Sequence, residues 1–304
     1  RRFHRRNQTY TGEYIMPLDN NTTVADIELP AYLNFDVINA PKYILHQGNG
    51  IRYRENATEV IDQWGGWLQD ATTTYKPVMY ADQVALVKES LIIAGLEYEP
   101  CEIKWNYTAN GGQMALHLTF PQMLITPQVG DAVAFRVTVY NSYDSSAVLQ
   151  QIAEALRLAC LNGMVRGDSA YSTKRKHTTN IDLNKEATKM QLGVEAFYDS
   201  ESQYQKWTQT PLLTSQVERL FKATLTKKKG GKFPYTVKTF DELMLDWRRT
   251  SSTMGCNVWS AYNVATAWAT HAPTESFIEA KRRERSTEVS RMLNHDLWKE
   301  MEEG

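Results

Sequence analysis

The sequence predicts an α+β protein with a three-stranded antiparallel meander packed by helices (a β-β-β-α core) and a mostly helical C-terminal half. Residues 101–107, 113–120 and 132–140 alternate apolar and polar side chains, with the period of two that is typical of half-buried strands. Short turn-forming segments separate these stretches, and helical periodicity dominates from residue 184 onward. We therefore expect an N-terminal arm over 1–40, an α+β core over 41–170 and a mainly helical region over 171–304.

Each of the three predicted strands has one apolar face. A one-residue slip of the pairing would turn that whole face outward, so the alternation sets which side chains point into the core. We therefore expect neighbouring antiparallel strands with these residues buried: Ile103, Trp105, Leu116, Leu118, Phe135 and Val137.

Helices are predicted on both sides of the meander. Residues 81–95 place apolar side chains on one helical face and end at a glycine, and residues 147–161 do the same before Gly163. Asp144, Ser145 or Ser146 is expected to cap the second of these helices. A helix broken at Gly65-Gly66 is expected over 56–70, and further helices over 184–207, 214–225 and from residue 240 to the end.

Composition and charge limit the possible classes of protein. Formal net charge is −1 over 304 residues, so binding to a polyanion would have to rely on local clusters. Cys101, Cys160 and Cys256 are far apart, which favours buried thiols in a reducing compartment over disulfides or a zinc site. The sequence has no apolar run of about 20 residues that could span a bilayer. We expect a cytoplasmic protein without a membrane partner.

Catalytic motifs are missing from the sequence. No two histidines have the spacing of a metal site, and neither a G-x-S-x-G motif nor a phosphate-binding glycine loop occurs. We therefore expect no metal, no cofactor and no catalytic residue, and a binding protein is favoured over an enzyme. A metal-dependent nuclease stays open as a third class of function.

Basic residues gather at four places, 1–6, 174–177, 227–232 and 281–285, although the net charge is close to zero. The polar face of the meander adds further cations and aromatic side chains. Cations that meet phosphates and rings that meet bases are the features that hold single-stranded nucleic acid. A solvated face is the alternative interpretation. The predicted DNA-binding residues are Lys104, Arg136, Tyr140, Arg157, Lys174, Arg175 and Lys176.

Two motifs follow each other in the stretch 140–167. Asn141-Ser142-Tyr143-Asp144 precedes the block Arg157-Leu158-Ala159-Cys160-Leu161-Asn162-Gly163. Together they resemble the DUF932 family of phage- and plasmid-borne proteins, and the similarity extends from about Tyr43 to Trp298. In "VWSAYNVATAW" (258–268) this chain has Ala267 or Trp268 where the family tends to have glutamate, so an acid has no role there. The resemblance implies no particular reaction.

A meander followed by a helix rich in small residues also resembles the core of Rad52-type single-strand annealing proteins. That resemblance is at the level of fold. It implies a homo-oligomer, a ring or filament, that binds and anneals single-stranded DNA during phage or plasmid recombination in the bacterial cytoplasm. The alternative is a phage or plasmid accessory protein that acts by protein–protein interaction, for instance in anti-defence.

Overall fold

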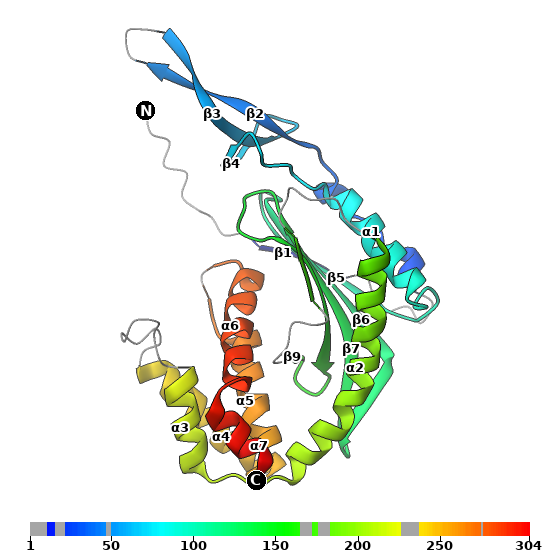
Figure 1. Ribbon diagram of the computed structural model, residues 1–304, viewed down its shortest axis with the longest axis vertical. Helices are drawn as coiled ribbons and strands as arrows, with labels where there is room; N and C mark the ends of the chain where they lie inside the picture. The colour runs from blue at the N-terminus through cyan, green and yellow to red at the C-terminus, as the bar shows by residue number, and fades with distance from the viewer. Residues whose placement is uncertain are drawn as a thin grey trace. The chain divides into compact units, whose positions relative to one another are not determined.

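The computed structural model describes residues 11–15, 22–46, 50–164, 172–175, 183–225, 237–274 and 276–304 (Figure 1). The chain forms two compact units. Unit 1 consists of Arg1–Leu118, Val137–Ile152 and Ser172–Gln191, and unit 2 of Thr119–Arg136, Ala153–Tyr171 and Leu192–Gly304. The units therefore alternate along the chain. The predicted division at residues 40 and 170 stays a prediction.

The larger sheet has seven strands in the described residues, in the order β1-β5-β6-β7-β8-β10, with β9 paired to β8. The predicted meander is confirmed as β5, β6 and β7, which are neighbours in this order. Val129 and Gly130 alone join β6 to β7, and such a short link can connect only antiparallel strands. The strands are β1 Thr11–Ile15, β5 Glu102–Thr108, β6 Gln113–Gln128, β7 Asp131–Ser142, β8 Leu149–Arg157, β9 Asn162–Met164 and β10 Ser172–Arg175.

The meander is buried on both faces over the first half of β6 and the strand segments beside it. All six predicted core residues are buried, which confirms the predicted face. His117, Thr138 and Tyr140 of the opposite face are buried as well, so this polar face is not the solvated one that the sequence pattern suggested. Nδ1 of His117 lies 2.9 Å from Oγ1 of Thr138, and Gln83 donates to the carbonyl of Tyr140 over 3.2 Å. Hydrogen bonds of this kind offset the cost of removing polar groups from water.

Residues 147–161 do not form the predicted helix. Leu149–Arg157 is strand β8, which pairs antiparallel with β10 and β9 and neighbours β7. The helix prediction rested on apolar residues at helical spacing before Gly163, and strand pairing outweighs that pattern here. The predicted β-β-β-α order therefore continues with a fourth strand instead of a helix.

The residues expected to cap that helix form a turn between β7 and β8. Oδ1 of Asp144 accepts a hydrogen bond from the amide of Ser146 over 3.0 Å, and Oγ of Ser142 accepts one from the amide of Ala147 over 2.9 Å. Ser145 has a positive φ of 58°, which such a tight turn requires. The predicted helix cap is wrong, because the polar side chains stabilise a strand-to-strand turn instead.

Tyr143 of this turn anchors helix α1, Tyr80–Ile93, which confirms the predicted helix 81–95. Its hydroxyl accepts a hydrogen bond from the amide of Tyr80 over 2.8 Å, and the two rings stack with centroids 4.0 Å apart. Oη of Tyr80 in turn donates to the carbonyl of Gly111 over 2.8 Å. Burial raises the pKa of both tyrosines above the usual value, so both hydroxyls keep their protons.

A second sheet has the strand order β2-β3-β4, with β2 Val37–His46, β3 Gly50–Asp62 and β4 Trp67–Thr72. The helix predicted over 56–70 is therefore wrong. Gly65 has a φ of 82° and Oδ1 of Asp62 accepts a hydrogen bond from the amide of Gly66, so the two glycines form the β3–β4 turn. Before this sheet, the described part of 1–40 contains β1 and two short 3₁₀ helices, Val24–Asp26 and Ala31–Leu33.

The C-terminal half is helical, as predicted. In unit 2 five aromatic residues from α2, α5 and α7 form one cluster, with ring centroids of neighbouring pairs 4.9–6.3 Å apart: Tyr204, Trp207, Trp259, Tyr262 and Trp298. The helices are α2 Leu183–Gln209, α3 Thr214–Thr224, α4 Val237–Met254, α5 Val258–His271, α6 Ile278–Leu293 and α7 Asp296–Glu303.

The anchor at the start of α1 can be tested with Tyr143→Phe. This change keeps the stacked ring but leaves the buried amide of Tyr80 without its acceptor, so we expect a loss of about 1–3 kcal/mol in the free energy of unfolding. Tyr98→Phe is the matched control, because Tyr98 is 79% exposed, and we expect a change within about 0.5 kcal/mol. Urea unfolding measures both. Equal stability of the two variants would contradict the anchor.

Candidate functional site at the β8–β9 hairpin

Strands β8 and β9 form a hairpin that lies against helix α5 in unit 2. Arg157 at the end of β8 pairs with Asn162 at the start of β9, so the whole family-like block 157–163 makes the turn. Nδ2 of Asn162 donates to the carbonyl of Asn263 over 3.4 Å, and the amide of Gly163 donates to Oγ1 of Thr270 over 3.1 Å. The hairpin is therefore fixed to α5 at two points about two helical turns apart.

Gly163 leaves room for an arginine. A Cβ atom at this position would lie 2.5 Å from Nη2 of Arg136, closer than real Cβ contacts come. The guanidinium of Arg136 is also held by Glu154, with Nε and Nη2 both 2.8 Å from Oε1. Glycine at position 163 thus lets the Arg136–Glu154 pair lie directly against the backbone of β9.

A second ion pair lies at the end of the hairpin. Nε of Arg157 is 2.5 Å from Oδ1 of Asp131, and the side chains are only 12% and 3% exposed. Oδ2 of Asp131 accepts a hydrogen bond from Nε1 of Trp259 over 2.7 Å. A buried carboxylate requires such partners, because removing an unpaired charge from water costs several kcal/mol. Asp131 therefore joins β7, β8 and α5.

The outer nitrogens of Arg157 have weaker partners. Nη1 lies 3.0 Å from Sγ of Cys160, and Nη2 lies 3.4 Å from Sδ of Met254. Burial alone would lower the pKa of Arg157, but the hydrogen bond and charge of Asp131 outweigh it and the pKa is raised. Sulfur is a weak acceptor, so the oxygen of an anion would bind these N–H groups more strongly than sulfur does.

His271 lies on the solvent side of the same hairpin. Its Nε2 is 2.9 Å from both the carbonyl oxygen of Cys160 and Oδ1 of Asn162, and because both are acceptors Nε2 carries the proton. Partial burial lowers the pKa of His271, and the charge of Arg282 lowers it further, whereas the hydrogen bond to Cys160 raises it. The net shift is downward, so the neutral ring is favoured.

The structure places two of the predicted DNA-binding residues at the β8–β9 hairpin. Arg136 and Arg157 lie beside the same hairpin, each paired with a carboxylate. The predictions for this set stay untested. The other described members belong to unit 1 and lie on β5, β7 and β10: Lys104, Tyr140, Lys174 and Arg175. Lys176 falls outside the described residues.

Sequence reasoning did not identify Asp131, Trp259 and His271. Asp131 follows the Gly130 turn at the first position of β7, where an acid is ordinary, and its partner Arg157 is 26 residues away. His271 ends helix α5, more than 100 residues after Cys160. Trp259 and His271 lie inside the helical region predicted from residue 240 to the end, so the sequence carried no signal for their contacts with Asp131 and the hairpin.

The basic cluster 281–285 serves the structure of α6. Arg282 pairs with the buried Glu279, and Lys281 lies 2.6 Å from Glu284. Nη1 and Nη2 of Arg285 donate to the carbonyls of Ala272 and Pro273 over 2.5 and 2.9 Å. These charges stabilise the helix and the loop before it, so this cluster offers less positive field than its sequence suggests.

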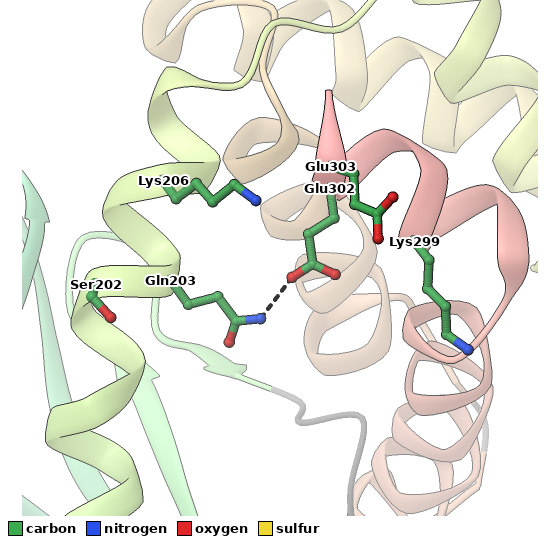
Figure 2. Close-up of a pocket in the computed structure, with 6 residues that line it drawn as sticks. All are labelled: Ser202, Gln203, Lys206, Lys299, Glu302 and Glu303. Atoms are coloured by element: carbon green, nitrogen blue, oxygen red, sulfur yellow. Dashed lines mark hydrogen bonds between the residues drawn. The ribbon is translucent and has the colours of Figure 1, made fainter.

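A hollow between α2 and α7 is a second candidate site (Figure 2). Oε1 of Glu302 accepts hydrogen bonds from Gln203 over 2.6 Å and from Nε1 of Trp207 over 2.9 Å. Two lysines face two glutamates around the hollow, so its charge selects neither an anion nor a cation. Its lining consists of Ser202, Gln203, Lys206, Lys299, Glu302 and Glu303.

Metal-binding groups and membrane spans were both searched for in the described ranges. No cluster of three or more His, Cys, Asp or Glu side chains there has a geometry that could hold a metal ion. Among the helices of those ranges, none is both long and apolar enough to cross a bilayer.

Fold and site together define an α+β protein in which the β8–β9 hairpin lies next to two arginine–carboxylate pairs. The chain belongs to the DUF932 family: the model of that family, described as a domain of unknown function, matches residues 72–298. The match begins at the last residue of β4 and covers the hairpin and helices α1–α6. No curated protein and no solved structure matches the chain.

The buried pair can be tested by unfolding. Arg157→Ala leaves the carboxylate of Asp131 without its cation, so we expect a loss of about 3–5 kcal/mol. Arg157→Met combined with Asp131→Asn should recover most of that loss. Arg291→Ala is the control, because the Arg291–Glu288 pair is exposed and exposed pairs contribute about 1 kcal/mol or less. Equal effects of Arg157→Ala and Arg291→Ala would refute the assignment.

The lowered pKa of His271 predicts a pH dependence. Its pKa in the native state is below the unfolded value of about 6.5, so the unfolded state binds more protons as the pH falls through that value. The free energy of unfolding should therefore decrease below about pH 6.5 and stay constant above it. His271→Gln, which keeps an N–H donor, should reduce this decrease. The measurement is urea unfolding of both proteins over the acidic range, and identical slopes would contradict it.

Proposed function

We propose that this protein binds single-stranded DNA and anneals complementary strands as a homo-oligomer in phage or plasmid recombination. One observation carries the proposal: Arg157, at the end of β8, is held by Asp131, and its two outer nitrogens lie against the sulfur atoms of Cys160 and Met254. Arg136 lies beside the same hairpin, against Gly163. Arginines whose orientation is already fixed lose little entropy when they bind phosphate.

Lys174 and Arg175 are the two further cations on which this proposal relies. Arg136 and Arg157 are each neutralised by a carboxylate, so they orient a phosphate more than they attract it. Lys174 and Arg175 lie on β10, an edge strand of the larger sheet among the described residues, opposite Gln150 and Leu149 of β8. Phosphate attraction depends on such local cations, because the net charge of the chain is only −1.

The likeness to Rad52-type proteins takes a revised form here. Among the residues that the structure describes, the next helix after strands β5 to β8 is α2. In unit 2 the Phe197 ring of α2 contacts the Phe135 ring of β7, with centroids 5.4 Å apart, and Glu201 accepts a hydrogen bond from the amide of Thr126. We propose α2 as the counterpart of the helix that follows the meander in those proteins. This part of the proposal is an analogy of folds.

A second candidate function is the binding of another protein, as in an accessory or anti-defence role. The observation in its favour is a group of exposed apolar side chains on the smaller sheet. The two functions differ in ligand. Annealing requires salt-sensitive affinity for single strands and an oligomer, whereas an interaction protein requires neither.

The test is the affinity for a fluorescein-labelled oligothymidine, measured by anisotropy from low to high salt. Lys174→Ala with Arg175→Ala should weaken binding and flatten the log–log salt dependence by about 0.7 for each phosphate that is no longer neutralised. Lys238→Ala with Arg291→Ala is the matched control, since it removes the same charge from exposed helical positions. The control should leave both affinity and slope unchanged.

Light scattering and a strand-annealing assay complete the test. We expect an oligomer that speeds the pairing of complementary strands without divalent metal. A monomer with no affinity for single strands would refute the proposal. Degradation of the oligonucleotide that stops with a chelator would instead identify a nuclease.

A further inference from the structure

An exposed apolar surface lies on the smaller sheet, in unit 1. It consists of Ile38 on β2, Ile61 on β3, Trp67 on β4 and Trp64 in the β3–β4 turn, and is called here the tryptophan face. Ile38, Trp64 and Trp67 are 56%, 73% and 59% exposed. Single exposed apolar residues are ordinary, but two neighbouring indoles with two isoleucines form a contiguous patch of the kind that marks an interaction site.

Strand register places three of these residues in one row. Ile38 is directly opposite Ile61, and Ile61 is directly opposite Trp67. Side chains directly opposite each other on neighbouring strands point to the same face with Cβ atoms about 5 Å apart. A bulge in β4 lies between the Val60 and Ile61 pairings, and the hydrogen bond from Trp67 to Asp70, which is opposite Glu59, places Trp67 on the same face as Ile61. The three residues therefore form one apolar row.

Both indoles are held in place. Nε1 of Trp67 donates to Oδ1 of Asp70 over 3.3 Å. The Trp64 ring contacts the Phe35 ring with centroids 5.7 Å apart, and its amide donates to Oδ1 of Asp62 over 2.9 Å. Ordered, exposed tryptophans lose little conformational entropy on binding, and tryptophan is the residue type most enriched at the energetic centres of protein interfaces.

The next row of the same face is acidic. Glu59 on β3 is directly opposite Asp70 on β4, and like charges at such positions repel each other. Lys42 forms an ion pair with Asp70, but Glu59 has no ion-pair partner among the described residues. A cation from outside that lies beside Glu59 would relieve this repulsion.

The tryptophan face also lies outside the family domain. The family model begins at residue 72, and the four residues of the face all precede it. The face therefore lies outside the matched region.

We propose that the tryptophan face binds an extended, basic segment of another protein, in which a large apolar side chain and a lysine or arginine are two residues apart. Residues i and i+2 of an extended segment point to one side, about 6.7 Å apart, and successive rows on one face of the sheet have the same spacing. The apolar side chain then lies on the Ile38–Ile61–Trp67 row, and the cation lies beside Glu59. This inference does not depend on DNA binding.

The charges disfavour the two other occupants. Nucleic acid bases stack on exposed indoles, but Lys42 neutralises only Asp70, so the remaining negative charge of Glu59 would repel a phosphate beside it. If a second copy of this chain paired its apolar row with this one, Glu59 and Asp70 of the two copies would face each other. A basic protein segment meets both the apolar row and the acidic row with favourable contacts.

The test uses the full chain and a fluorescein-labelled peptide with the repeated order threonine, tryptophan, threonine, arginine. We expect saturable binding by anisotropy, and none with a peptide that has glutamate in place of arginine. Trp67→Ser should weaken binding about 30-fold, the loss expected for a central tryptophan. Glu59→Gln should weaken it several-fold and reduce its salt dependence. Tyr98→Ser, at a residue exposed elsewhere in unit 1, should have no effect.

Several outcomes would overturn the proposal. One is equal affinity of the wild type, Trp67→Ser and Ile38→Ser for the arginine peptide. A second is displacement of the arginine peptide by oligothymidine in the wild type but not in Trp67→Ser, which would assign the face to nucleic acid. A third is an oligomer, seen by sedimentation, that Trp67→Ser converts to a monomer, which would assign the face to a second copy. Circular dichroism and thermal unfolding confirm that each variant is folded, as expected for exposed positions.

Discussion

A single buried carboxylate holds the candidate site together. Asp131 begins β7, accepts a hydrogen bond from Trp259 of α5 and pairs with Arg157 at the end of β8. The two oxygens are thereby satisfied by two different elements, and the remaining donors of the guanidinium point to Cys160 and Met254. Because an unpaired carboxylate in this position would be costly, strand, hairpin and helix can adopt only arrangements that keep all three groups in contact.

The meander could be predicted from the sequence because its alternation has only one interpretation. Apolar side chains recur with a period of two in three segments joined by turns, and a helix would require a period of 3.6. Residues such as Trp105 and Phe135 are buried as the strand pattern requires. Strand β8 could not be predicted, since its glutamine, glutamate, alanine and leucine residues suit a helix and only pairing with β7 and β10 makes it a strand. The same limit explains the mistaken helix over 56–70, where paired glycines form a hairpin turn.

The candidate site was only partly predictable, because its residues come from elements that are distant in the sequence. Arg157 could be singled out as a polar residue in an apolar stretch, and Gly163 as a stop signal. Their partners Asp131 and Arg136 lie on another strand, and His271 lies on a helix more than 100 residues later. Periodicity determines which side of an element a residue occupies but not which residue of another element it meets. Both buried ion pairs therefore became visible only with the strand register.

The two compact units are interleaved along the chain, so neither is encoded by one contiguous stretch of the gene. Each unit takes its residues from three separate stretches, with β6, β7 and β8 each passing from one unit to the other. No single cut of the polypeptide yields either unit intact, so neither can be deleted, duplicated or exchanged between genes as one contiguous segment. Folding must likewise wait for stretches that are distant in sequence to meet, which slows it. Only segments outside this interleaved region can be gained or lost without disrupting either unit.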